Sequence, residues 1–476
     1  MGIVAPKFVG ERVRRREDPR LITGQATYVD DVRLPGMVHL AILRSPYAHA
    51  RIKSIDASAA RALPGVVAVV VGPEIETGFP HLVKAGGPDG KREVVRYPLA
   101  VDEVRFVGDP VAAVVAESRE VARDALELIV VDYEPLPAVI DLEEAASPGA
   151  PRVYSEFPDN IAYVDRSGGG DVEEAFRQAD QVVRARIVNH RVAPLPMEPR
   201  ATVAEYRGAP GELTVWASTQ WPHQLRSHLA ELLGLPENRV RVIAPEVGGG
   251  FGAKAEVYPE ELLVAALAVK LQRTVKFVAD RREEFASMIH GRGQVDFVEM
   301  AVKRDGRVLG MKLRVLADLG AYYQVNTAGV PPLTAKMAPG PYFIPAVSCE
   351  VVGVFTNKVP TAAFRGAGRP EATFLLERMM DIIAHDLKLD PAEVRRKNLL
   401  RPDMFPYTTP MDATYDSGNY EPTLDKALAL AGYRQFREEQ AAARAQGRYV
   451  GIGLSFYVEI CGMGPSKDMG GGGWEA

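Results

Sequence analysis

The sequence predicts a mixed α/β (α+β) fold that is divided into several domains. Two observations carry this prediction. Short strand-like runs alternate with helical patterns near the N-terminus, and longer strands of antiparallel type precede helices further along the chain. With 476 residues the chain is long enough for two or three domains that each bury a core.

The first predicted domain covers residues 1–140. Apolar and β-branched runs predict strands in it, and an apolar stripe at helical spacing predicts one helix before the last strand. The strands are expected at 37–43, 66–72, 110–116 and 130–140, with the helix at 119–129. Turn signals at 147–151 (SPGAP) and 167–170 (SGGG) mark the passage to the next domain.

The second predicted domain covers residues 141–400, and RDGR at 304–307 predicts a hairpin between its two longest strands. The strands are expected at 181–188, 201–206, 212–218, 240–245, 274–280, 293–304 and 307–320, and the helices at 223–234, 255–271 and 370–389.

Residues 401–476 form the remaining segment, with a helix expected at 422–432 and a buried strand at 451–464. Because the chain stops in a glycine run shortly after this strand, we expect either a flexible tail or a fragment of a longer protein.

Composition and sequence patterns argue against several classes of function and of binding site. The net charge of -5 gives no electrostatic reason to expect nucleic acid as a partner. There is no signal peptide pattern and no apolar run that would span a bilayer, so we expect a cytoplasmic protein without an integral membrane segment. Two cysteines exclude a disulfide scaffold and an iron–sulfur cluster held by this chain alone. The histidines show no zinc-binding spacing.

The strongest local motif is a glycine turn at Gly248–Gly252, which lies between a strand and a helix. Glycines allow positive φ angles and let a ligand approach bare N–H groups, and a helix N-terminus behind them favours an anion. The turn therefore predicts either an anion cradle or a tight packing turn.

Two nucleotide motifs can be compared with this turn. The P-loop pattern fails, because alanines flank Lys254. The dinucleotide pattern is met by Gly248, Gly250 and Ala253, but the acidic residue Asp280 lies about thirty positions beyond Gly250, where ~20 are expected. An NAD(P)-dependent dehydrogenase is therefore the second hypothesis.

Three segments in order carry a resemblance. They are residues 20–60 (RLITGQATYVDD and onward), ASTQ at 217–220 followed by VGGGFGAK at 247–254, and residues 356–400 around AAFRGAGRPEA. Together they resemble the N-terminal part of the molybdopterin-binding large subunit of the molybdenum hydroxylases. This family includes xanthine dehydrogenase, aldehyde oxidase and aerobic carbon monoxide dehydrogenase, and the chain is most similar to form II homologues of the last.

The resemblance implies a hammerhead-like α/β domain at 1–140, a first molybdopterin-binding domain at 141–400 and the truncated start of a second at 401–476. It implies that Gln220 lies over the metal and hydrogen-bonds an oxo group, and that Gly249, Gly250, Phe251 and Gly252 contact the cofactor. Without the resemblance, we would interpret Gln220 as a polar residue at the end of a strand.

A second turn, Arg365–Gly366–Ala367, is expected to face the metal, with Arg365 positioning cofactor or substrate. From the residues alone, Arg365 caps a loop or pairs with Glu371 or Asp381. Family members that oxidise purines or aldehydes have phenylalanine where Ala367 stands, and the copper-containing members have a cysteine in this turn. The absence of a thiol here argues against carbon monoxide as substrate and leaves an aldehyde or an N-heterocycle.

The implied reaction is hydroxylation with water as the oxygen source. The resemblance implies a molybdenum–molybdopterin cofactor in its cytosine dinucleotide form, held without direct side-chain ligands to the metal. It also implies 2Fe-2S and FAD centres on partner subunits, and a dimer of heterotrimers. The general-base glutamate is expected in a C-terminal half outside this chain, and not at Glu256, Glu260, Glu261 or Glu459. The other alternative is a non-catalytic assembly fragment.

Overall fold

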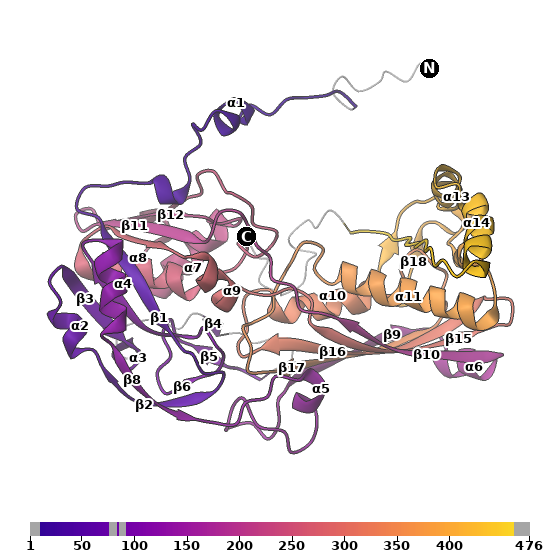
Figure 1. Ribbon diagram of the computed structural model, residues 1–476, viewed down its shortest axis with the longest axis horizontal. Coiled ribbons are helices and arrows are strands. Elements are labelled where there is room, and N and C mark those ends of the chain that lie inside the picture. The colour runs from indigo at the N-terminus through magenta and orange to yellow at the C-terminus, as the bar shows by residue number, and fades with distance from the viewer. Residues whose placement is uncertain (1–9, 76–82, 85–91, 461–476) are drawn as a thin grey trace.

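The computed structural model describes residues 10–75, 83–84 and 92–460. Two large β-sheets lie side by side along the long axis of the molecule (Figure 1). The seven-stranded sheet has, in spatial order, β13 (Val240–Ile243), β12 (Glu212–Ala217), β11 (Ala201–Arg207), β14 (Val275–Val278), β1 (Val38–Arg44), β7 (Pro110–Ala116) and β3 (Val66–Val71). The five-stranded sheet has β10 (Gln181–Asn189), β15 (Gln294–Val302), β16 (Val308–Gly320), β17 (Val347–Phe355) and β9 (Ile161–Gly169).

Helices cover both faces of the seven-stranded sheet. In β1, Leu40 and Ile42 pack with α7 (Pro222–Leu233) and α8 (Pro259–Leu271), whereas Ala41 packs with α4 (Arg119–Glu127) on the opposite face. This alternation is what the period of two in a strand requires. Burial on both faces also explains why β7, an interior strand, is apolar at every position from Pro110 to Ala116.

The seven-stranded sheet crosses the domain border expected near residue 140. Strand β1 pairs in parallel with β14, with Val38 opposite Val275, so strands from both sides of that border share one sheet. The border therefore does not separate two sheets, and the predicted domain ranges remain a prediction.

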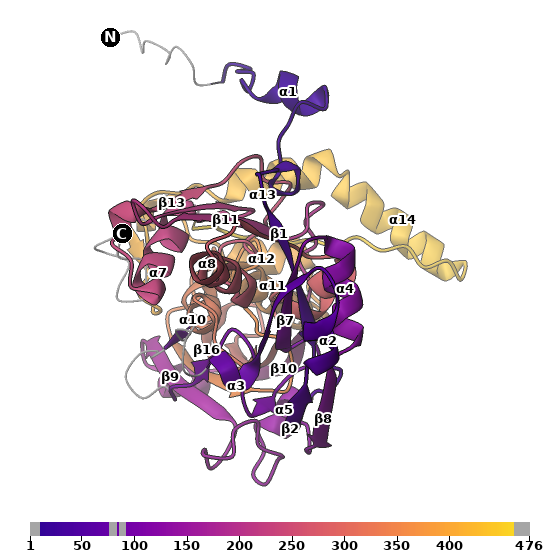
Figure 2. The same cartoon turned by 90° about the vertical axis from the view of Figure 1, so that its left-hand side faces the viewer.

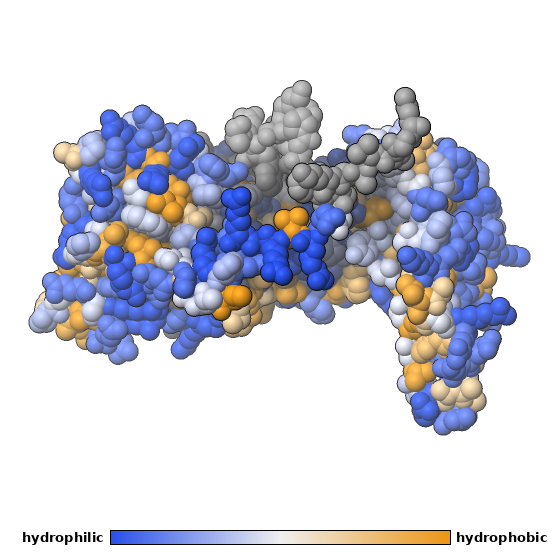
Figure 3. Space-filling view, turned by 90° about the horizontal axis from the view of Figure 1, so that it is seen from above, coloured by the Kyte–Doolittle hydropathy of each residue, from blue (hydrophilic) through white to orange (hydrophobic). Residues whose placement is uncertain are grey.

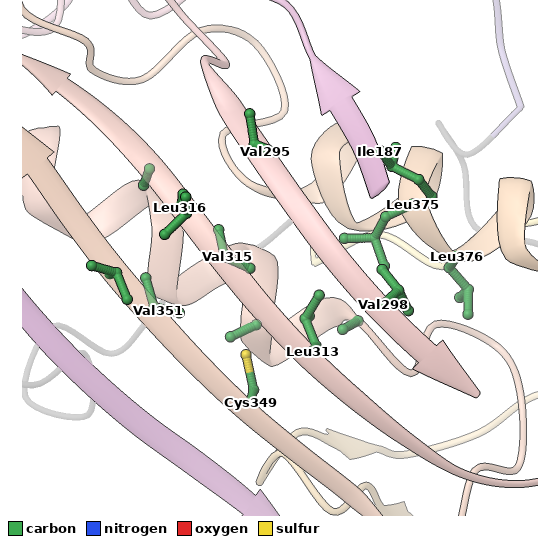
Figure 4. Packing of buried hydrophobic residues seen from close by; sticks show 14 of the residues in the cluster. Ile187, Val295, Val298, Leu313, Val315, Leu316, Cys349, Val351, Leu375 and Leu376 are labelled. Atoms are coloured by element: carbon green, nitrogen blue, oxygen red, sulfur yellow. The ribbon is translucent and has the colours of Figure 1, made fainter. Parts of the chain in front are cut away.

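The core of the five-stranded sheet lies beneath α10 (Val330–Met337) and α11 (Arg369–Leu387), while α5 (Leu142–Ala145) and α6 (Val172–Arg177) lie on the other face (Figure 1). Figure 4 shows Leu375 of α11 beside Val298 of β15, in a cluster that also contains side chains of β16. The expected hairpin joins these two strands, with Val302 opposite Val308.

The other elements are smaller. A three-stranded sheet contains β6 (Glu103–Val104), β2 (Ala50–Asp56) and β8 (Val130–Pro135), and two hairpins contain β4 (Val83–Lys84) with β5 (Val95–Arg96) and β18 (Tyr407–Thr408) with β19 (Thr414–Tyr415). The remaining helices are α1 (Asp18–Ile22), α2 (Ser58–Ala62), α3 (Gly72–Ile75), α9 (Arg281–Ser287), α12 (Pro391–Asn398), α13 (Glu421–Leu430) and α14 (Tyr433–Ala445).

Helix α14 projects from the body and has no buried residue (Figures 2 and 3). Among the described residues no helix is long and apolar enough to cross a membrane.

The turn expected at 167–170 is wrong for its first three residues, which end strand β9. Glycine is needed there because the neighbouring strand comes very close: a Cβ on Gly168 would lie 2.3 Å from the carbonyl oxygen of Val347. SGGG is thus a site of close strand approach, and not a linker.

Two expected elements are at least four residues shorter than predicted, and a third does not form in its described part. The helix expected at 255–271 begins at Pro259, and the strand expected at 130–140 ends at Pro135. Of the strand expected at 451–464, residues 451–460 form no regular element, and 461–464 lie outside the described residues. Individual hydrogen bonds to side chains hold this segment instead of a strand ladder. Arg395 Nη2 donates to Leu454 O (2.9 Å), and Phe456 N donates to the carboxylate of Glu377 (2.8 Å).

Replacing Leu375 by alanine should destabilise the protein by about 2 to 5 kcal/mol, because the cavity forms in a closed core. The adjacent Phe374 is 44% exposed, so Phe374→Ala is the matched control and should cost less than about 1 kcal/mol. Chemical denaturation of the two variants measures both values. Equal losses would contradict the packing described here.

Candidate functional site

Gln220 is fixed against the glycine turn through its side-chain oxygen. Oε1 accepts hydrogen bonds from the backbone N–H groups of Gly252 (2.8 Å) and Lys254 (3.3 Å), and Gln220 N donates to Lys254 O (2.9 Å). Because backbone N–H groups only donate, they determine which end of the amide is the oxygen. The two N–H groups of Nε2 make no hydrogen bond within the described chain, so this neutral amide has donors to offer.

The glycine turn leaves three consecutive backbone donors unused. The N–H groups of Gly252 and Lys254 bind Gln220, and that of Gly248 binds Glu198 Oε2 (2.8 Å). Those of Gly249, Gly250 and Phe251 have no acceptor among the residues the structure describes. Three adjacent N–H groups without an acceptor can donate to an anion.

Close packing dictates the glycines of this turn. A Cβ on Gly250 would lie 2.4 Å from Gln220 Oε1, and one on Gly252 would lie 2.4 Å from Ala363 O. Phe251 itself has a φ of 56°, in the left-handed region, and its side chain is 41% exposed. The turn is therefore closely packed and also carries free donors, and the anion cradle stays a prediction.

A buried ion pair between Lys254 and Glu198 stabilises the glycine turn. Lys254 Nζ lies 3.0 Å from Glu198 Oε2, which also accepts from Ser218 Oγ (2.6 Å). The Lys254 side chain is fully buried, and burial lowers its pKa while Glu198 opposes this shift. Lys254 thus points into the protein and cannot act as a P-loop lysine does.

The Arg365 turn touches the glycine turn directly. Arg365 N donates to Phe251 O (2.8 Å), and Gly366, Ala367 and Gly368 all have positive φ angles before α11 begins. The guanidinium of Arg365 is exposed and has no partner among the described residues.

The pairing of Arg365 with Glu371 or Asp381, one of the sequence alternatives, is wrong. Arg292 lies 3.6 Å from Glu371, and Asp381 binds Arg378 and Arg395 (both 2.9 Å). The two turns therefore bring together Gln220, Phe251 and Arg365, residues far apart in sequence.

The glutamates near the turn have other partners. Glu260 binds Arg44 (2.6 Å) and Arg200 (3.1 Å), Glu261 accepts from Tyr258 N (2.9 Å), and Glu256 accepts from Asn326 Nδ2 (2.8 Å). Glu459 lies 3.3 Å from Arg369. Burial raises the pKa of Glu256 to about 8, although the bond from Asn326 opposes the shift.

A cavity of about 830 Å³ lies elsewhere, between β1, α4 and α9. Its lining includes none of the predicted site residues, and Arg44 and Lys276 in its wall already bind carboxylates. The two turns therefore remain the candidate functional site.

The dinucleotide hypothesis fails on topology. In a Rossmann unit a helix follows the glycine turn directly, and the strand after that helix lies beside the strand before the turn. Here α8 begins only at Pro259, and β14, the strand after it, is separated from β13 by β12 and β11.

Comparison with known families identifies the chain. Residues 153–399 match the model of the molybdopterin cofactor-binding domain, and residues 23–137 match that of the aldehyde oxidase and xanthine dehydrogenase a/b hammerhead domain. The chain belongs to the molybdopterin-binding aldehyde oxidase and xanthine dehydrogenase family. The resemblance and the mixed α/β fold class inferred from sequence are thereby confirmed.

Several relatives in this molybdopterin-binding family are similar over nearly the whole chain. The nicotine 6-hydroxylase large subunit of Paenarthrobacter nicotinovorans is 39% identical over 96% of this chain and 56% of the relative. The structure resembles quinoline 2-oxidoreductase from Pseudomonas putida 86, with TM-score 0.89 and 38% identity over 94% of this chain and 57% of the other.

Carbon monoxide dehydrogenase from Oligotropha carboxidovorans gives TM-score 0.90 and 37% identity, over 96% and 59% of the two chains. The chain thus spans a little over half the length of these relatives.

The Glu198–Lys254 pair predicts a non-additive stability effect. Lys254→Met should destabilise by about 3 to 5 kcal/mol, because it leaves a largely buried carboxylate without its cation. Glu198→Gln combined with Lys254→Met should recover part of this loss, because neither charge remains. Unfolding midpoints of the three variants test this; a double variant that is as unstable as the sum of the single variants would contradict the pairing.

The raised pKa of Glu256 predicts that the free energy of unfolding depends on pH. Its folded pKa of about 8 lies above the ordinary 4.5, so its contribution to stability is complete below pH 4.5 and is lost as pH rises to about 8. Glu256→Gln does not ionise and should gain stability over the wild type across this range, by about 1 kcal/mol or more. Unfolding midpoints at pH 4.5 and 8.5 measure it, with the exposed Glu299→Gln as control; equal pH slopes in all three proteins would contradict the shift.

Proposed function

We propose that this chain is the molybdenum-cofactor-binding subunit of an oxidoreductase that hydroxylates an aldehyde or an N-heterocycle, with water as the oxygen source. One observation carries the proposal. The free N–H groups of Gly249–Phe251, the amide donors of Gln220 and the exposed Arg365 meet where two turns are hydrogen-bonded to each other. A neutral donor, backbone donors and one cation together suit an anionic cofactor.

The residues fit molybdopterin, which we propose to be in its cytosine dinucleotide form. When bound, the molybdenum cofactor accepts the two electrons that leave the substrate C–H bond. The N–H groups of Gly249, Gly250 and Phe251 stabilise negative charge, and Gln220 Nε2 donates without adding charge. Arg365, with Gly366 and Ala367, positions cofactor or substrate at the facing turn. No protein side chain is proposed as a direct ligand of the metal.

The substrate class follows from the Arg365 turn. Arg365–Gly366–Ala367 contains no thiol, and the described cysteine, Cys349, is buried in the core of the five-stranded sheet, where burial raises its pKa to about 12 (Figure 4). A copper-binding thiolate is thus missing from this turn, which argues against carbon monoxide. Relatives named for nicotine and quinoline support an N-heterocycle.

The general base and the electron-transfer centres of the proposed enzyme are expected outside these 476 residues. We propose that 2Fe-2S and FAD subunits carry the electrons away, that a C-terminal half supplies the general-base glutamate, and that the cytoplasmic assembly is a dimer of heterotrimers. This chain would contribute a hammerhead-like domain (1–140), a first molybdopterin-binding domain (141–400) and the start of a second (401–476).

Analysis of the native complex tests the proposal. It should contain molybdenum and a pterin, and should hydroxylate nicotine, quinoline or benzaldehyde with ¹⁸O taken from labelled water. Gln220→Ala should lower kcat/KM about 10²-fold, because one donor to the reacting centre is lost. Gln435→Ala on α14, whose amide binds only Glu439 within the described chain, should have no effect.

A complex that assembles without molybdenum or pterin would contradict the proposal and favour a non-catalytic assembly role. Oxygen incorporated from O₂ would contradict the proposed source of oxygen.

A further inference from the structure

Arg292 belongs to a segment that lies between Val192 and the residues leading to the Arg365 turn. The segment His290–Gly293 is hydrogen-bonded to Val192 on one side and, through His290 O, to Ala362 N (2.9 Å) on the other. It is also packed closely: a Cβ on Gly291 would lie 2.3 Å from the Cβ of Phe364. The segment therefore fixes the backbone from which Arg292 extends.

The Arg292 guanidinium holds the backbone of the Arg365 turn. Nη1 donates to Phe364 O (3.0 Å) and Nη2 donates to Arg365 O (2.9 Å), while the guanidinium lies 5.0 Å from the centre of the Phe364 ring. A planar guanidinium can bind two successive carbonyl oxygens, whereas an ammonium group offers no such fixed fork.

A buried carboxylate completes this arrangement. Glu371 Oε1 lies 3.6 Å from Arg292 Nη1, and its side chain is completely buried in the first turn of α11. Arg292 has a φ of 64°, a left-handed conformation that costs free energy in a non-glycine residue. Such a conformation persists only where the contacts of the side chain and backbone compensate for it.

We propose that Arg292, supported by Glu371, is a positioning residue that sets the conformation of the Phe364–Ala367 turn and thereby places Arg365. The inference rests on the proposed role of Arg365 at the cofactor site. Arg292 acts through this turn and needs no contact with substrate. Arg292→Lys keeps the positive charge beside Glu371 but cannot donate to both Phe364 O and Arg365 O in the fixed geometry of a guanidinium.

Hydrogen–deuterium exchange on the native complex tests the structural step without any measurement of activity. The amides of Arg365 and Ala367 are bonded to Phe251 O and Phe364 O (both 2.8 Å). In Arg292→Lys both amides should exchange about tenfold faster, because the turn that carries them loses the charge-assisted bonds to Phe364 O and Arg365 O. Exchange in strands β15 and β16 should not change. Arg184→Lys, in an exposed arginine–glutamate pair across β10 and β15, is the matched control.

Unchanged exchange in the turn, or faster exchange through the whole sheet, would overturn the proposal. If Arg292→Lys does not assemble, Glu371→Gln replaces it and should accelerate the same two amides about threefold or more, since only the supporting carboxylate is lost. Failure of both variants to assemble would show a general folding role and would also overturn it.

A double-variant cycle tests the functional step. Arg292→Lys should lower kcat/KM about tenfold in the wild type and have no effect in an Arg365→Ala background, since it acts only through Arg365. Additive losses would overturn the proposal. Molybdenum and pterin content separates this result from the cofactor question: a complex that lacks both refutes the proposed function, whatever the exchange of the turn.

Discussion

The hydrogen bond from Arg365 N to Phe251 O joins two turns. The Arg365 turn comes after β17 of the five-stranded sheet, and the Phe251 turn comes after β13 of the seven-stranded sheet. Each sheet has its own core, and the two turns are the ends of chain segments that those cores hold in place. Close contacts make this junction specific, because neither Gly250 nor Gly252 has room for a Cβ. The junction joins the turns that carry a neutral amide, three free N–H groups and an exposed cation.

The same junction explains the buried charges around it. The Glu198–Lys254 pair stabilises the glycine turn, and the Arg292–Glu371 pair stabilises the Arg365 turn. Each pair contains a carboxylate that is largely or completely buried and a cation that compensates it, so removing one partner leaves an unbalanced charge. The donors of the site therefore stay in place without a ligand, and a cofactor would meet a surface that needs little rearrangement.

Much of this fold follows from sequence patterns. Nearly continuous apolar runs predict β7, and the helical stripe of residues 370–389 predicts α11 to within two residues at each end. Strands β2, β9 and β17 are not among the predicted strands, although β17 (VSCEVVGVF) contains an apolar run. β2 (ARIKSID) is half polar because much of it is exposed, and β9 ends in glycines that read as a turn. The pairing of β1 with β14 joins residues more than two hundred positions apart, and no local pattern encodes it.

For the site, the sequence predicts the two turns but not what holds them. The glycine run and FRGAG stand out, and Gln220 gains meaning only from the family resemblance. Glu198 and Arg292 lie in segments without a motif, and their roles depend on contacts between distant parts of the chain.

A cryo-electron-microscopy structure of the native complex tests the central claim most directly. The account predicts a molybdopterin whose anionic groups lie within hydrogen-bond distance of the N–H groups of Gly249–Phe251, with Gln220 Nε2 directed at the metal's ligands. A pterin bound away from both turns, or a nicotinamide nucleotide at the glycine turn, would contradict it.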